Sequence, residues 1–171
     1  MKKLLLFTLI IPLISFSQNT MNKKKNAIEK NKMNYAKTYE MKKKTEARII
    51  DKWEEYSKAF EYSDFDKIKT YFTYPVTLSV FADPIIIDDE KNLMKFYSQI
   101  RNDVQDGYLY SMLEKSRIIW ISKEICMLDA TYSRFNDKYE KIFTGRGIYM
   151  FKKVDKNWKM FSMSSVDLNK N

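Results

Sequence analysis

The strongest constraint on the fold is a change in hydrophobic period near Tyr108. Before this point apolar residues recur at steps of three and four, as in amphipathic helices, and after it they follow the two-residue period of strands. Short polar breaks at residues 122–124, 136–138 and 155–157 divide the second half into four runs. Each break is short enough for a hairpin, so we predict four antiparallel strands in a meander after a helix-rich half.

The helix-rich half is predicted to hold three helices and two short strands. Thr45 can cap the first helix. Ser63 can cap the second, with Asp66 at the capping-box position, and Asp88 or Asp89 can cap the third. The segments "VTLSVF" and "PIIID" between the last two helices read as strands. The apolar helix faces are Ile49, Trp53, Tyr56 and Phe60; Phe65, Ile68 and Phe72; and Leu93, Phe96 or Tyr97, Ile100 and Val104.

Helices gathered on one side of a meander define an α+β fold in which the helices cover one face of the sheet. The runs "IIWI" and "ICML" are apolar on both faces, whereas a sheet packed on one face only should alternate more cleanly. We therefore expect the outer sheet face to be covered as well, most simply by a second copy of the chain in a homodimer.

The first 17 residues have the pattern of a secretory signal peptide. Lys2 and Lys3 precede an apolar run, and Ser15 and Ser17 place small residues at the −3 and −1 positions of a cleavage site before Gln18. A membrane anchor is the alternative, but the run is shorter than the ~20 residues that span a bilayer. We expect an exported protein, periplasmic or secreted.

The formal net charge of +9 is confined to the N-terminal part of the chain. Residues 18–48 carry ten basic and three acidic side chains, whereas residues 49–171 carry 19 of each. A nucleic-acid-binding domain is therefore not expected. We divide the chain into a signal at 1–17, a lysine-rich stem at 18–45 that is mobile or partly helical, a domain at 46–166 and a tail at 167–171. The stem is either simply solvated or makes weak contact with an anionic surface.

The content of cysteine and histidine limits the chemistry. Cys126 is the only cysteine, so an internal disulfide is excluded, and its apolar neighbours indicate a buried side chain. The chain has no histidine to activate this thiol or to bind zinc. We expect no metal and no cofactor.

The segment "IFTGRGIYMF" holds two of the three glycines, Gly145 and Gly147. A phosphate-binding loop would need a helix after it, but the next residues continue as a strand, so we interpret the glycines as a bend that lets the sheet curl. A hairpin centred on residues 137 and 138 would place Asp129 directly opposite Arg146 as a cross-strand ion pair. The alternative is an acid and a cation inside a pocket.

The order of elements resembles the nuclear transport factor two-like superfamily, particularly its SnoaL-like branch, over residues 46–166. The resemblance is carried by "FYSQIRNDVQDG", "DATYSRFN" and "TGRGIYMFKKVDKNWKMFSMSS". It implies a cone-shaped, curved antiparallel sheet with three helices packed on its concave face around a pocket, and frequent dimerisation through the outer face.

Two functions follow from this resemblance. The first is a non-catalytic exported module that binds a small apolar or amphipathic ligand or mediates assembly. The second is a cofactor-free isomerase, cyclase or dehydratase, because relatives use a pocket carboxylate as general base and a tyrosine or an acid as hydrogen-bond donor; the candidates are Asp129, Asp64 and Tyr56. The predicted pocket residues are Trp53, Tyr56, Phe60, Tyr97, Tyr110, Asp129, Arg146 and Tyr149, with a plain hydrophobic core as the alternative for the aromatic ones.

Overall fold

The computed structural model describes residues 11–80 and 83–166, with side chains from residue 20 onward. It divides into two units, Met1–Thr45 and Glu46–Asn171. The predicted tail at 167–171 and the first ten residues of the predicted signal peptide lie outside the described residues, as do the side chains of residues 11–17.

Helix α1 (Ile11–Glu61) includes residues of both units. Thr45 is not an N-cap, contrary to the prediction, because its hydroxyl donates 2.9 Å to the carbonyl of Met41 one turn earlier inside the helix. Residues 20–44 are all exposed. Within the described ranges, no helix combines the length and apolarity that a membrane span requires.

Two shorter helices complete the helical part of the second unit. Helix α2 (Phe65–Lys69) is capped by Asp64, whose carboxylate accepts from the Lys67 N–H, and not by Ser63, whose φ of 57° lies in the left-handed region. Helix α3 (Glu90–Asn102) is capped by Asp89, one of the two predicted residues. Leu93, Phe96 and Tyr97 form its buried face, as its spacing predicts.

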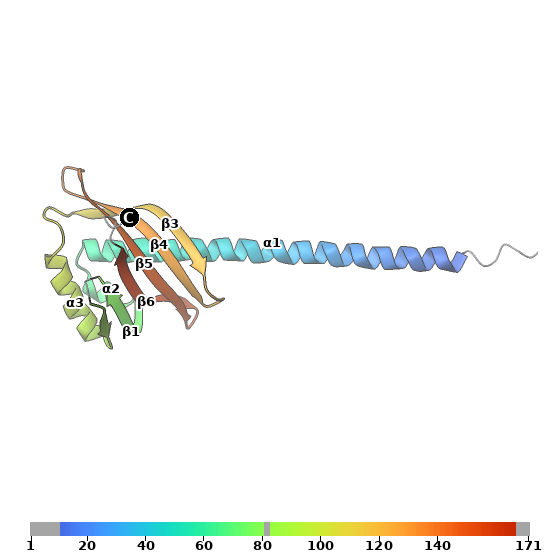
Figure 1. Ribbon diagram of the computed structural model, residues 1–171, viewed down its shortest axis with the longest axis horizontal. Coiled ribbons are helices and arrows are strands. Elements are labelled where there is room, and N and C mark those ends of the chain that lie inside the picture. The colour runs from blue at the N-terminus through green and yellow to red at the C-terminus, as the bar shows by residue number, and fades with distance from the viewer. Residues whose placement is uncertain (1–10, 81–82, 167–171) are drawn as a thin grey trace, which may run out of the picture. The chain divides into compact units, whose positions relative to one another are not determined.

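The six strands form one sheet in the order β2-β1-β6-β5-β4-β3 (Figure 1). Strands β3 to β6 make the predicted antiparallel meander. The sheet is not antiparallel throughout, because β1 pairs with β6 in parallel through registers such as Leu78 with Met163. The strands are β1 (Phe72–Ser79), β2 (Ile85–Ile87), β3 (Tyr110–Trp120), β4 (Ile125–Phe135), β5 (Lys141–Val154) and β6 (Asn157–Val166).

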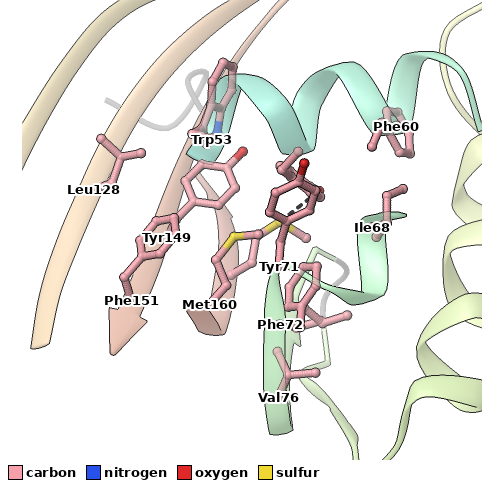
Figure 2. Close-up of a cluster of buried hydrophobic side chains, with 14 of the residues drawn as sticks. Trp53, Phe60, Ile68, Tyr71, Phe72, Val76, Leu128, Tyr149, Phe151 and Met160 are labelled. Atoms are coloured by element: carbon pink, nitrogen blue, oxygen red, sulfur yellow. Dashed lines mark hydrogen bonds between the residues drawn. The ribbon is translucent and has the colours of Figure 1, made fainter. Parts of the chain in front are cut away.

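The hydrophobic core lies between the concave face of this curved, open sheet and the helices. Figure 2 shows Trp53 of α1 beside Tyr149 of the sheet, and Phe60 further along the same helix above Ile68 of α2. Alternation along each strand sends one set of side chains into this core and the other to the outer face. The predicted α+β class, with a cone-shaped sheet covered by helices on its concave face, is confirmed.

Candidate functional site

A cavity of about 220 Å³ opens between the helices and the concave face of the sheet. By comparison, a dry protein cavity of about 150 Å³ holds a benzene molecule. The wall combines aromatic rings with hydroxyl groups, one arginine and one aspartate, which is the composition expected of a small-molecule pocket. The lining residues are Tyr56, Ser57, Phe60, Val80, Ile100, Asp103, Val104, Ser111, Tyr132, Arg134, Phe143, Gly147, Tyr149, Met163 and Ser165.

Buried tyrosines form one side of the cavity. The hydroxyl groups of Tyr56 and Tyr97 are 2.8 Å apart and share a hydrogen bond, and the Tyr56 hydroxyl also donates to the sulfur of Met163 at 3.6 Å. Burial raises the pKa of Tyr56, Tyr97 and Tyr149 well above the usual value near 10. These hydroxyl groups are therefore neutral hydrogen-bonding groups at physiological pH.

The two glycines of β5 make room for aromatic rings on the concave face. A methyl group added at Gly145 would lie 2.7 Å from the Tyr132 ring and from Phe143, and one at Gly147 would lie 2.8 Å from the Tyr149 ring. Both glycines continue their pairing with β4 without a bulge. Their local role is to make room for the aromatic rings that line the cavity. The sequence pattern predicts a bend at these glycines and does not predict this role.

Arg134 reaches the cavity from β4. Its guanidinium carbon lies 5.2 to 5.9 Å from the ring centroids of Phe60, Tyr108, Tyr132 and Phe143, within the range of cation–π attraction. Its Nη1 donates to Gln105 Oε1 at 2.5 Å. The surrounding rings hold the planar group in place at the cavity wall.

The structure brings three of the eight predicted pocket residues together in the wall: Tyr56, Phe60 and Tyr149. Tyr97 is fully buried behind Tyr56. Trp53 packs against the rings of Tyr132 and Tyr149 within the core. Tyr110 stacks on Phe135, at 5.0 Å between centroids and 9° between planes, on the outer face.

Asp129 and Arg146 lie on the outer face of the sheet, not inside the cone. Arg146 Nε and Nη2 each donate 2.8 Å to the Asp129 carboxylate, and Arg117 Nη2 lies 3.4 Å from it. The bonds from Arg146 are the main cause of the lowered pKa of Asp129. An ionised, paired carboxylate facing away from the cavity does not fit the role of its general base.

The ion pair forms in a register different from the predicted one. Arg146 is directly opposite Thr131, and Asp129 is opposite Ile148, so the two charged side chains are diagonal neighbours. The reason is the five-residue connection 136–140, in which Tyr139 adopts a φ of 62° and the pairing shifts between Arg134 and Phe135. The shift from the predicted register is two residues, which leaves both side chains on one face.

The other candidate acid, Asp64, has a structural role as the cap of α2. Asp103, at the C-terminal end of α3, is the carboxylate among the described cavity residues, and no sequence pattern singled it out.

In the described part of the chain, no group of three or more Cys, Asp or Glu side chains is arranged to hold a metal ion. Cys126 is fully buried as predicted, and burial raises its pKa to about 12, so the thiol stays protonated.

Sequence reasoning missed most of the polar wall, including Arg134, Ser57, Ser111 and Asp103. Arg134 stands in the quoted run "DATYSRFN", two residues from Tyr132, and two-residue alternation places both on the face that carries Leu128. This alternation could have identified Arg134 as a wall residue. To use it, one must know which face of the strand is concave, and aromatic side chains on both faces of the strand prevented that choice.

A curved sheet closed on one side by helices around a cavity defines a cystatin-like, NTF2-like protein. Residues 45–168 match the family described as NTF2-like protein (DUF6841), and the chain belongs to this family. The predicted resemblance to the superfamily is thereby confirmed. No curated protein matches the chain in sequence.

Solved structures agree on the fold. A cystatin-like protein of unknown function from Nostoc punctiforme superposes with a TM-score of 0.62 at 11% identity, covering 72% of this chain and 92% of its own. An NTF2-like protein of unknown function from Pseudomonas putida superposes with a TM-score of 0.60 at 8% sequence identity, covering 74% of this chain and 91% of its own. The SnoaL-like Aln2 from a Streptomyces species superposes with a TM-score of 0.58 at 8% identity, covering 71% of this chain and 89% of its own. At these identities the likeness extends to the fold alone.

Proposed function

We propose that this protein binds a small, largely apolar molecule in the cavity between α1, α3 and the concave face of the sheet. The observation that carries the proposal is the wall itself, in which the rings of Phe60, Tyr132 and Phe143 alternate with hydroxyl groups and a guanidinium group. A cavity with an apolar wall and a few fixed polar groups suits a ligand with a flat body and one polar end.

Several features support a preformed site. Absence of a Cβ at Gly147 leaves room for the Tyr149 ring, and the bond between Tyr56 and Tyr97 holds the neighbouring side of the wall. These contacts join groups of the protein itself, so they restrain the side chains of the wall. A ligand would then gain apolar burial without a large cost in side-chain ordering.

Catalysis by the predicted acids is not proposed. Asp129 is ion-paired on the outer face and Asp64 caps α2, so neither carboxylate is placed to take a proton from a molecule in the cavity. Tyr56 also lines the cavity, and its hydroxyl hydrogen contacts the weak acceptor of the Met163 sulfur. In our proposal a polar group of the ligand replaces that sulfur as the acceptor, which orients the ligand.

The test is to fill the cavity and measure binding. Ser57 lines the cavity from α1, whereas Ser98 is an exposed serine on α3. We expect Ser57→Phe to weaken binding of neutral one-ring probes such as benzamide and p-cresol by about tenfold or more, because the new ring occupies their space. Ser98→Phe, the matched control, should leave binding unchanged. Equal binding by both variants, measured by calorimetry, would remove the cavity as the binding site.

We also propose that the chain is exported and cleaved before Gln18, on the basis of the N-terminal pattern. Expression in a bacterium with a periplasm should give a mature chain beginning at Gln18, detected by intact-mass measurement of the periplasmic fraction. Replacing Ser15 and Ser17 with Leu should leave the precursor uncleaved, because both positions then carry large side chains. A full-length chain retained in the cytoplasm would contradict this proposal.

A further inference from the structure

Among the described residues, the guanidinium group of Arg134 has no negative partner. Its donor contact is to the neutral side chain of Gln105, and it makes no ion pair with any carboxylate in the described part of the chain. Its Nε is buried without a hydrogen-bond partner among those residues. The Arg134 side chain as a whole is half-buried, and partial removal of a charged group from water without a counter-charge has a cost. An unpaired guanidinium group at a cavity wall therefore points to a ligand that supplies the negative charge.

The other arginines of the sheet behave differently. Arg146 and Arg117, on the outer face, both contact the Asp129 carboxylate. Of the three, the one without a carboxylate in the described residues is the one that lines the cavity. The chain therefore provides counter-charges for arginines of the outer face and leaves one open toward the cavity.

A second arginine lies in the same aromatic cluster. The Arg101 guanidinium carbon is 5.0 Å from the Tyr108 ring centroid and 5.7 Å from that of Phe60, the two rings that also contact Arg134. Arg101 Nη2 donates 3.4 Å to the Glu61 carbonyl, and its Nε is also buried without a partner in the described residues. Asp103 is the opposing charge at the wall, and it forms no ion pair with Arg134 within the described residues.

We propose that the cavity selects an organic anion, a carboxylate on a small flat apolar body, and that Arg134 is the residue that recognises its charge. This inference rests on the proposed function and adds the class of ligand. A guanidinium group presents its N–H donors in a planar fork that matches a carboxylate, and the surrounding rings hold that fork. The apolar body would pack on the aromatic wall beside it.

The cavity volume restricts the body to about one ring. Because a benzene molecule fits a cavity of about 150 Å³, the 220 Å³ here has room for a ring with one short substituent. Benzoate and benzamide meet this limit and are nearly identical in shape. They differ in charge, so their comparison isolates the role of the cation.

The experiment is calorimetric titration of the full mature chain with benzoate and with benzamide. We expect benzoate to bind about 10- to 100-fold more tightly, the range for a hydrogen bond to a charged group. Arg134→Met should remove this preference, so that benzoate and benzamide bind this variant with affinities within about threefold of each other. Arg134→Lys keeps the charge and loses the fork, so it should retain part of the preference.

Arg117→Met is the matched control, because it removes the same charge from the outer face and should leave the benzoate preference intact. Equal or tighter binding of benzamide to the unmodified chain would overturn the inference and leave the cavity proposal standing, and this comparison requires no variant to fold. Binding of neither compound at millimolar concentration would overturn both. An equal loss of preference in Arg117→Met and Arg134→Met would assign it to overall charge and overturn the role of Arg134.

Discussion

At the scale of single residues, the position of a polar group relative to the sheet decides its role. Tyr97 is completely buried, and its hydroxyl group has a partner in Tyr56. Asp129 is nearly as well buried, yet it lies on the outer face, where the side chain of Arg146 supplies two hydrogen bonds. Both residues satisfy the rule that buried polar groups need partners, one inside the cone and one outside it.

The tyrosine pair is expected to contribute measurably to stability. Tyr97→Phe removes one hydroxyl group and leaves that of Tyr56 with the weak acceptor of Met163. We expect the free energy of unfolding to fall by about 1 kcal/mol, the usual net value of such a bond. Urea denaturation of Tyr97→Phe beside Tyr62→Phe, which alters an exposed ring, measures the difference. Identical midpoints for both variants would contradict the assigned role of the bond.

The Asp129 ion pair predicts a pH dependence of stability. The folded-state pKa of Asp129 is lowered, so its contribution is present above the unfolded-state pKa near 3.9 and is lost as the pH falls through the folded value. Asp129→Asn should therefore lower the thermal midpoint by a few degrees near pH 7, and the difference from the unmodified chain should shrink below about pH 4. Thermal melts across pH 2 to 8 test this; a difference that persists unchanged at pH 2 would refute it.

At the scale of elements, α1 shows how one helix can carry two kinds of surface. From Ile49 onward it places Trp53, Tyr56 and Phe60 against the sheet. Residues 20–44 are exposed and rich in lysine. The periodic apolar residues of the domain part are packed, whereas the stem has Ile28, Tyr35 and Tyr39 exposed. The net positive charge of the chain is thus concentrated in this exposed helical segment.

We propose that this segment contacts anionic surfaces weakly. Each lysine near such a membrane contributes about 1 kcal/mol of attraction. Replacing Lys23–Lys25 with glutamine should lower partitioning to vesicles containing phosphatidylserine by about tenfold or more at low salt, as measured by co-sedimentation. The same three substitutions at Lys152, Lys153 and Lys156 are the control and should have a smaller effect. Unchanged partitioning in the stem variant would exclude this contact.

At the scale of the whole molecule, the two faces of the sheet have different tasks. The concave face holds the core and the cavity. On the outer face, Ile119, Met127 and Met150 are aligned across β3, β4 and β5, and all three are at least partly exposed. An apolar row beside an ion pair is a surface suited to another protein chain.

We propose homodimerisation through this outer face. Met150→Lys places a charge in the middle of the apolar row and should convert the dimer to a monomer, because the charge would be buried without a partner. Light scattering coupled to size-exclusion chromatography should give twice the chain mass for the unmodified protein and the single-chain mass for Met150→Lys. Met33→Lys, on the exposed helix, is the matched control and should remain dimeric. A monomeric unmodified protein at high concentration would contradict the proposal.

Local patterns were sufficient for α3 and for the strands β3 to β6, but not for the start of α1 or for Phe72, which was predicted on the second helix and lies in β1. The spacing of Leu93, Phe96 and Tyr97 predicted α3 and its buried face, and the polar breaks predicted the β3–β6 meander. The separation of charge between stem and domain is also a property of the sequence alone. These predictions hold because helical and strand periods depend on neighbours a few residues apart, and the sequence shows those neighbours directly.

Only the tertiary structure decided the parallel pairing of β1 with β6, the diagonal register of Asp129 with Arg146, and the membership of the cavity wall. Each depends on groups far apart in the chain or on the conformation of one connection. A single residue in the left-handed region changes which side chains meet across a hairpin. Arg134 is part of the wall because its strand turns that side chain toward the helices, and its lack of a carboxylate partner among the described residues is a property of the assembled wall that no local pattern encodes.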